Sequence, residues 1–208
     1  GIGYSFSLEE IGAAQQTGVN LTSEGAMAAR EAYEQLVDEV AFNGNTDLAV
    51  EGLLNTTGIT SAAAGATFAA SSPQAVLSVI NTALTGIMTA TNGIEQADTV
   101  LLPLAQYGDI TTRQIAPESS MTVLQFVQQA NVYTTMTGRP LNIVGTHRLT
   151  NKMVVYRRDP QVVKLHMPMP LRFIAPQARN LEIVTLGMFR FAPVSIRRPA
   201  AMRYVTGI

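Results

Sequence analysis

The sequence contains no cysteine and no tryptophan, and only two of its 208 residues are histidine. Without cysteine, the chain can form neither a disulfide nor a thiolate-bound metal site. The two histidines, His147 and His166, are separated by 18 other residues, and neither belongs to a metal-binding motif. We therefore expect both to be structural, and we expect no catalytic residue, no metal ligand, no bound cofactor and no enzymatic activity.

Long apolar runs and the common ligand-binding motifs are missing as well. No stretch of about 18 apolar residues could span a bilayer, and no signal peptide is recognisable, so we expect no membrane association and no export. The chain has neither a phosphate-binding loop nor a GxSxG motif, and the opening GIGYSF lacks the third glycine of a dinucleotide fingerprint. An enzyme or a small-ligand-binding protein remains as a distant alternative.

Charged residues are scarce and unevenly placed. They make up 14% of the chain, whereas about 25% is typical of soluble domains. Residues 1–118 hold 13 carboxylates and two arginines, while residues 119–208 hold 12 basic side chains and two carboxylates. This segregation favours contacts between subunits. The alternative is that the two halves pair within one subunit or stay solvated, which is the usual fate of isolated surface charges.

Arginine dominates the basic residues, since 12 of the 14 are Arg. Its planar guanidinium binds a carboxylate through two hydrogen bonds and tolerates desolvation better than the lysine ammonium. A nucleic-acid surface is less well supported, because no aromatic stacking platform accompanies the basic pairs. We predict a subunit interface formed by six residues: Arg157, Arg158, Arg197, Arg198, Glu34 and Asp38.

Capping residues predict four helices. Ser7 and Glu10 form a capping box ahead of a helix over residues 8–17 that stops at Gly18. A longer acidic helix begins near Thr22 or Ser23 and ends at Gly44. Its apolar side chains recur at helical spacing: Ala26, Ala29, Tyr33, Leu36, Val37 and Val40.

A third helix begins at Ser72 with Pro73 in its first turn, and it ends near Asn92 and Gly93. Ser120 is expected to cap a fourth helix, with Val123 and Val127 among its inward residues. Short buried strands are predicted at 99–103 and 141–145, and two strands joined around Asp159 and Pro160 at 152–167. Residues 56–73 are predicted to be a loop, and residues 180–205 are predicted to be rich in strand. The fold class is therefore α+β, with a possible division into two subdomains.

A family resemblance extends over nearly the whole chain. The segment YSFSLEEIGAAQQTGVNLTSEGAMAAREAYEQLVDEVAFNGNTDLAVEGLLN resembles the short helix, long helix and glycine-rich exit of phage and prophage major capsid proteins. TVLLPLAQY, SSMTVLQFV, KMVVYRRDPQVVKLHMPMPLRF and the ending IRRPAAMRYVTGI follow in the order found in that family. The resemblance implies the Hong Kong 97-like capsid fold, which encapsulin shells share.

In that fold, a peripheral domain with a long spine helix and long strands supports an axial domain with a central sheet and flanking helices. The resemblance places the peripheral domain at residues 1–50 and 156–192 and the axial domain at 51–155 and 193–208. The spine helix would span residues 23–43. Family members carry an N-terminal arm and an extended loop ahead of this segment. Neither is present here, and the chain starts at Gly1 rather than Met, so we expect a cut chain.

The implied function is that of a structural subunit of an icosahedral phage or prophage capsid. Such a subunit self-assembles into capsomers, as a homo-oligomer, and encloses double-stranded DNA without reading its sequence. It belongs to the virion and assembles in the cytoplasm of the bacterial host. The alternative with the same fold is the shell of an encapsulin-type nanocompartment, and a packaged cargo protein would distinguish the two.

Overall fold

The computed structural model describes residues 1–18 and 20–208, and the chain divides into two compact units. Unit 1 comprises Gly1–Asn55 and Leu165–Val194, and unit 2 comprises Thr56–Lys164 and Ser195–Ile208. These boundaries follow residues 55, 164 and 194, whereas the domain boundaries implied by the family resemblance follow residues 50, 155 and 192. The first one moves because the N–H of Leu53 donates to the carbonyl of Ala41, which keeps residues 51–55 with unit 1.

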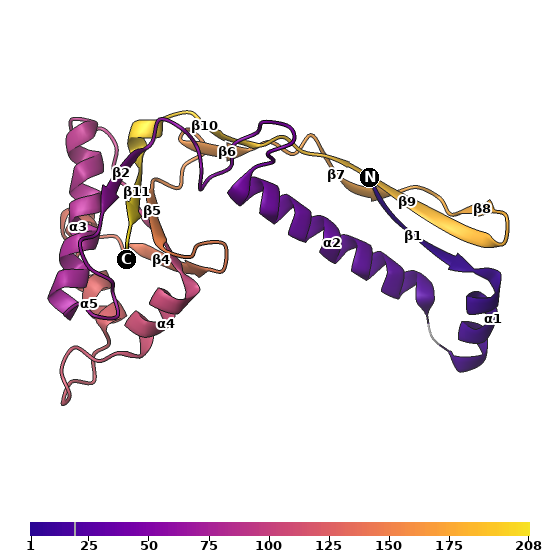
Figure 1. Cartoon of the computed structure of the whole chain (residues 1–208), viewed down its shortest axis with the longest axis horizontal. Coiled ribbons are helices and arrows are strands. Elements are labelled where there is room, and N and C mark those ends of the chain that lie inside the picture. Colours follow the sequence, from indigo (N-terminus) through magenta and orange to yellow (C-terminus); the bar gives the residue numbers. More distant parts are fainter. Residues whose placement is uncertain (19) are drawn as a thin grey trace. The chain divides into compact units, whose positions relative to one another are not determined.

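Unit 1 is built on a four-stranded antiparallel sheet (Figure 1). The long strand β9 (Glu182–Arg190) pairs with β1 (Ile2–Ser7) along one edge. Along its other edge it pairs with β7 (Met169–Phe173) and β8 (Gln177–Arg179) in turn. The sequence shows β9 because Glu182–Arg190 is rich in apolar and β-branched residues. No local sequence pattern indicates the short strand β1, whose residues form a strand by pairing with β9.

Two helices complete unit 1. The capping box of Ser7 and Glu10 and the left-handed Gly18 limit α1 to Leu8–Thr17, as predicted. Helix α2 spans Leu21–Asn43, and its cap is Asn20 rather than the predicted Thr22 or Ser23, because the Asn20 side chain accepts the N–H of Ser23.

Helix α2 packs on β1 through its smallest residues. A side chain at Gly25 would lie 2.8 Å from the rings of both Tyr4 and Phe6, so the helix can approach the strand only because this position is glycine. Further along, the Tyr33 ring contacts Phe189 of β9 at 4.9 Å between centroids. The predicted apolar stripe is therefore only partly buried: Ala29 and Tyr33 are covered, whereas Leu36 is 42% exposed.

Unit 2 contains a mixed five-stranded sheet with the order β2-β11-β5-β3-β4. The strands are β2 (Thr60–Ala63), β11 (Met202–Thr206), β5 (Lys152–Tyr156), β3 (Thr99–Pro103) and β4 (Asn142–Thr146). The central strands β5 and β3 run antiparallel, whereas the outer pairs β11–β2 and β3–β4 are parallel. This sheet joins segments that lie far apart in the sequence, since β2 near residue 60 pairs with β11 near the C-terminus.

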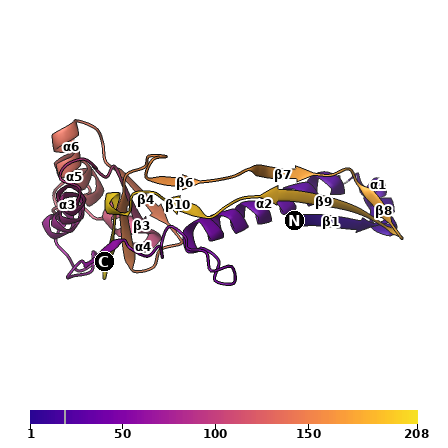
Figure 2. The same cartoon turned by 90° about the horizontal axis from the view of Figure 1, so that it is seen from above.

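Helices α3 (Pro73–Ala90), α5 (Val123–Ala130) and α6 (Val132–Thr137) cover one face of this sheet (Figure 2). Helix α4 (Leu104–Thr112) follows β3 directly and contacts β4, and the short 3-10 helix Pro199–Ala201 precedes β11. The core of unit 2 lies between helices and sheet. Its largest fully buried side chains include Phe68, Ile80, Leu84, Ile87, Leu102, Ile110, Leu141, Met153, Met202 and Ile208.

Several predictions for unit 2 need correction. The fourth helix is capped by Thr122 rather than Ser120, because Thr122 forms the capping box with Gln125. The predicted loop at 56–73 contains β2, whose residues acquire strand structure by pairing with β11. The predicted strand at 141–145 is only half buried, because β4 is the last strand of its sheet and Val144 is exposed.

The two strands predicted around Asp159 and Pro160 exist, but they do not pair with each other. The first is β5, which belongs to the five-stranded sheet. The second is β6 (Val163–Leu165), which pairs with β10 (Val194–Ile196) in a separate two-stranded sheet. The chain passes from one unit to the other within these two short strands.

Candidate functional site

The described residues contain no cluster of side chains suited to metal binding. Among residues 1–18 and 20–208, no group of three or more His, Cys, Asp or Glu side chains could hold a metal ion. The side chain of His147 is exposed and that of His166 is partly exposed. Within the same residues, no helix is long and apolar enough to cross a membrane. A functional site must therefore be sought among the surfaces and the charged clusters.

The most buried charged group is Glu95, in the turn between α3 and β3 of unit 2. Only 4% of its side chain is exposed. Its Oε2 accepts a hydrogen bond from Nη1 of Arg157 at 2.7 Å, and its Oε1 accepts one from Nη1 of Arg198. Asp159 completes the cluster, because its Oδ2 lies 3.0 Å from Nη2 of Arg157. We call these four residues the Glu95 cluster.

The two arginines of the Glu95 cluster favour the ionised form of Glu95. Burial, the largest single effect, raises the pKa of Glu95, but the hydrogen bonds and charges of Arg198 and Arg157 together outweigh it and hold the pKa below its ordinary value. The hydrogen bond to Glu95 raises the pKa of Arg157. A carboxylate saturated by two guanidiniums is a poor proton donor or base, so the cluster serves to fix the chain segments that carry it.

Two of the six predicted interface residues, Arg157 and Arg198, belong to this cluster. Both pair with a carboxylate of their own chain, as the alternative of charge pairing within one subunit describes. The sequence did not identify Glu95 as their partner, because Glu95 lies between Ile94 and Gln96 in a mixed polar and apolar segment four residues before the buried strand β3. A buried carboxylate needs a cationic partner, but no local pattern showed that Glu95 is buried.

The remaining predicted residues lie on different surfaces. Arg158 and Arg197 are exposed, and their backbone N–H groups donate to Oδ1 of Asp98 and to the carbonyl of Val162. Glu34, on α2 of unit 1, pairs with Arg30 one turn earlier at 3.0 Å, and both side chains are well exposed.

Asp38 lies one turn after Glu34 on the same helix and is partly buried. The structure thus places the two predicted acids in unit 1 and the four predicted arginines in unit 2. The prediction that they meet between neighbouring subunits stays a prediction.

A polar cavity of about 510 Å³ lies beside the Glu95 cluster in unit 2. Its charged lining comes from three arginines and two aspartates: Arg139, Arg157, Arg158, Asp98 and Asp159. We call it the arginine pocket. Sequence reasoning missed Arg139, which follows the left-handed Gly138 at the end of α6 and so projects from a helix terminus.

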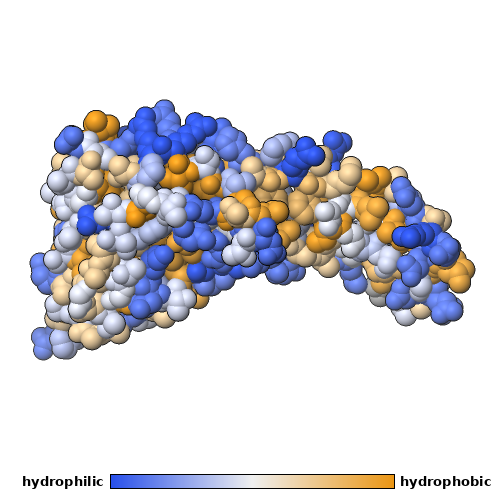
Figure 3. Space-filling model, turned by 45° about the horizontal axis from the view of Figure 1, so that its top comes forward, coloured by the Kyte–Doolittle hydropathy of each residue, from blue (hydrophilic) through white to orange (hydrophobic). Residues whose placement is uncertain are grey.

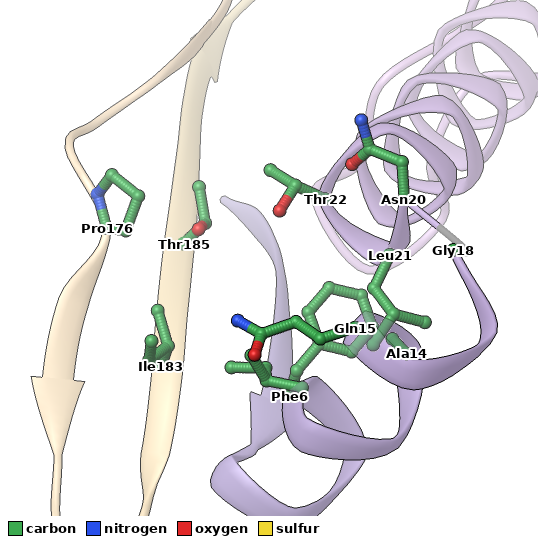
Figure 4. A pocket seen from close by; sticks show the side chains of 11 residues that line it. Phe6, Ala14, Gln15, Gly18, Asn20, Leu21, Thr22, Pro176, Ile183 and Thr185 are labelled. Atoms are coloured by element: carbon green, nitrogen blue, oxygen red, sulfur yellow. The ribbon is translucent and has the colours of Figure 1, made fainter.

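Unit 1 has a different kind of cavity, of about 460 Å³ (Figure 4). Phe6 of β1, Ala14 of α1, Leu21 of α2 and Ile183 of β9 contribute to its wall. No Asp, Glu, His, Lys or Arg side chain lines it. The described part of this lining can accept an apolar side chain and contains no charged one.

Apolar side chains are also exposed on the surface of unit 1, in the right-hand part of Figure 3. Leu186 and Met188 alternate along β9 with the buried Thr185 and Gly187, so they lie on the opposite face of the strand. The aromatic contact of Tyr4 with Phe173 belongs to the other face, which α2 covers. One face of this sheet therefore carries apolar side chains that unit 1 leaves open.

Comparison with known proteins identifies the family of this chain. A family model described as major capsid protein matches residues 1–208. A search of curated proteins gave no match. Among solved structures, the capsid of Myoviridae phage XM1 has a TM-score of 0.83 and 23% sequence identity, over 99% of this chain and 71% of that one.

Two further solved structures share the fold at lower identity. A virus-like particle from Pyrococcus furiosus has a TM-score of 0.65 and 14% identity, over 98% of this chain and 75% of that one. An encapsulin complex from Synechococcus elongatus has a TM-score of 0.59 and 12% identity, over 99% and 72%. The predicted α+β capsid fold is thereby confirmed, and because the family model covers every residue, this chain belongs to the major capsid protein family.

Proposed function

We propose that the chain is the shell-forming subunit of an icosahedral phage or prophage capsid and associates with copies of itself. The observation that carries the proposal is the match of all 208 residues to the major capsid protein family. The open apolar face of β9 supports it, because side chains such as Leu186 and Met188 gain from burial against a neighbour.

Within this proposal, the two units correspond to the two domains of the capsid fold. Unit 1, with α2 as the spine helix, would be the peripheral domain, and unit 2 would be the axial domain. The subunit would be part of the virion and would assemble in the cytoplasm of the bacterial host. Double-stranded DNA would fill the interior and would be held without sequence-specific contacts.

The charged interface is part of the same proposal. Arg158 and Arg197 have exposed side chains available to a neighbouring subunit. Arg157 and Arg198 could contact a neighbour only with whatever donors Glu95 leaves free. Glu34 and Asp38 remain candidates on α2. Exposed pairs of this kind weaken with salt, because the Debye length falls to about 8 Å at 0.15 M ionic strength.

An encapsulin-type shell is the second candidate, and it is supported by the likeness to the Synechococcus elongatus encapsulin complex. The phage XM1 capsid resembles the chain more closely, with a TM-score of 0.83 against 0.59. We therefore favour the viral shell. A catalytic or ligand-binding role is the weakest candidate, since the described residues bring together no group of acids or histidines that could hold a metal.

Electron microscopy of the full product of the gene, expressed alone and with its neighbouring genes, tests the proposal. We expect closed particles, and nuclease-protected double-stranded DNA in particles from the native context. Closed particles that contain a specific protein cargo and no DNA would instead establish the encapsulin alternative. A product that stays monomeric in both settings would contradict a shell-forming role.

A further inference from the structure

The loop between α4 and α5 in unit 2 is held as a tight hairpin that projects beyond these helices (Figure 1). An isolated antiparallel bridge joins Gln114 to Thr122 at its base. At its tip, the N–H of Ser119 donates to the carbonyl of Ala116 at 2.9 Å, which closes a four-residue turn. Pro117 occupies the second position of this turn, where its fixed φ favours the turn before any contact is made. The tip is therefore ordered in advance.

The other central residue of this turn is Glu118. Unit 2 has four further carboxylates, and each has a hydrogen-bond or ion-pair partner inside the unit: Glu95, Asp98, Asp109 and Asp159. Glu118 is exposed, and its side chain has no hydrogen bond or ion pair with any residue in the described ranges 1–18 and 20–208. The hairpin thus presents a single uncompensated carboxylate at its most prominent point.

The arginine pocket offers the complementary charge. Arg157 is already held by Glu95 and Asp159. The side chains of Arg139 and Arg158 are exposed, and neither forms an ion pair within the part of the chain that the structure describes. Two guanidiniums therefore face one cavity without a carboxylate partner, and Glu118 of the same chain does not line that cavity.

The mixed charge of the pocket distinguishes between possible partners. Asp98 and Asp159 also line it, so its three arginines exceed its carboxylates by only one. The continuous negative charge of a nucleic-acid backbone would meet repulsion from the two aspartates. A single carboxylate on a narrow turn has the charge that matches the excess.

We propose that Glu118 of one subunit enters the arginine pocket of a second copy of this chain and pairs there with Arg139 and Arg158. This contact presupposes the shell-forming role proposed above. The hairpin and the pocket are two different surfaces of unit 2, so each copy can offer its hairpin to one neighbour and its pocket to another. Such a head-to-tail contact closes into a ring when its rotation divides the circle evenly. It would fix the register of neighbouring axial domains within a capsomer.

Charge-reversal variants of the full gene product test the contact. Glu118→Arg and Arg139→Glu are each made alone and then together, and the control combines Glu118→Arg with Arg190→Glu, an exposed arginine of unit 1. Sedimentation and electron microscopy over a concentration series measure ring and shell formation. Each single reversal should raise the concentration required on the order of tenfold, because it places like charges together.

The double variant Glu118→Arg with Arg139→Glu should restore assembly to nearly the wild-type concentration, whereas the control pair should not. Single variants that assemble like the wild type, or a double variant without rescue, would overturn the contact. So would an Arg139→Glu shell that forms normally but loses its DNA, because this would make the pocket a nucleic-acid site. If Glu118→Arg lowers the melting temperature, Glu118→Gln replaces it, with an expected rise of about threefold.

The design separates the contact from the function on which it rests. A wild-type product that forms no rings or shells at all contradicts the shell-forming role and the contact together. A wild-type product that assembles normally, with variants that are indifferent to these charges, removes only the contact and leaves the shell-forming role intact.

Discussion

The two units differ in where they keep their apolar side chains. Of the 31 buried apolar residues in the described chain, 26 belong to unit 2 and only five to unit 1. Of the 15 large apolar residues that are exposed in the same ranges, 11 belong to unit 1. Unit 2 thus has a core of its own, whereas unit 1 is a sheet with helices on one face.

This difference has an energetic meaning. A buried Leu or Met side chain gains roughly 1.5 to 3 kcal/mol relative to an exposed one. Unit 1 therefore holds unused burial energy on its open surface, which only a partner can release. If the protein assembles, we expect unit 1 to gain more stability from contacts with neighbouring subunits than unit 2. We expect unit 2 to be stable without such contacts.

The largest expected effect is on the core of unit 2. Leu84 of α3 is 1% exposed and lies in the main cluster. Leu84→Ala should lower the free energy of unfolding by about 2 to 5 kcal/mol, because burial is lost and a cavity remains. The matched control is Leu104→Ala on α4, where the side chain is exposed and the loss should be below about 0.5 kcal/mol. Denaturant unfolding followed by circular dichroism compares them. Equal losses would mean that unit 2 has no privileged core.

The next effect concerns the exit from α2 in unit 1. Gly44 has φ 76° and ψ −163°, a conformation open essentially to glycine alone, and a side chain there would run into the carbonyl oxygen of Val50. Gly44→Ala should therefore cost more than the roughly 1 to 3 kcal/mol of backbone strain alone. Gly18→Ala is the control, because Gly18 also has positive φ but open space around it. Its cost should be about 1 to 2 kcal/mol. Thermal unfolding ranks the two, and a harmless Gly44→Ala would refute the constraint.

A smaller effect is expected from the Glu95 cluster. Glu95→Gln keeps the shape but removes the charge that holds Arg157 and Arg198. We expect a loss of about 1 to 3 kcal/mol at neutral pH, below the 3 to 5 of a fully buried pair, because both guanidiniums are more than a third exposed.

The pH dependence of this loss has a definite sign. The folded-state pKa of Glu95 lies below its ordinary value of 4.5, so the ionised side chain stabilises the folded state above that pH. This contribution disappears as the pH falls through the folded pKa. The difference in unfolding free energy between wild type and Glu95→Gln should therefore shrink below about pH 4.5. A difference that stayed constant down to pH 3 would contradict the ion-pair account.

The smallest effect on the isolated subunit should come from the open face of unit 1. Leu186→Thr and Met188→Thr replace exposed strand residues by another good strand former, so the stability of the monomer should change by less than about 0.5 kcal/mol. Assembly, in contrast, should weaken. Met136→Thr on the exposed side of α6 provides the control in unit 2. Light scattering measures the particle size of each variant at the same protein concentration. Unimpaired assembly of the β9 variants would show that this face stays open in the shell.

Local chemistry explains which parts of the fold were predictable. The bounds of α1 follow from Ser7, Glu10 and Gly18, and the bounds of β3 follow from five consecutive apolar or β-branched residues up to Pro103. Each of these signals acts within a few residues along the chain. Strand β2 lacked such a signal, because Thr60–Ala63 becomes a strand only by pairing with β11, about 140 residues later.

The candidate sites were harder to predict, for a related reason. The sequence showed that arginines were abundant in its second half, but the partner of Arg157 lies 62 residues earlier and that of Arg198 lies 103 residues earlier. Leu36 shares the helical stripe of Tyr33, yet only Tyr33 meets a second aromatic ring from β9. Which member of a stripe is buried depends on the partner layer, and no pattern within the helix contains that information.

Hydrogen exchange measured by mass spectrometry on the free subunit and on assembled particles tests the contrast between the units most directly. We predict that α3 and β3 of unit 2 are strongly protected in both forms, whereas β7, β9 and α2 of unit 1 gain most of their protection on assembly. Unit 1 segments that are already as protected in the free subunit as those of unit 2, and that gain nothing in the particle, would contradict the account.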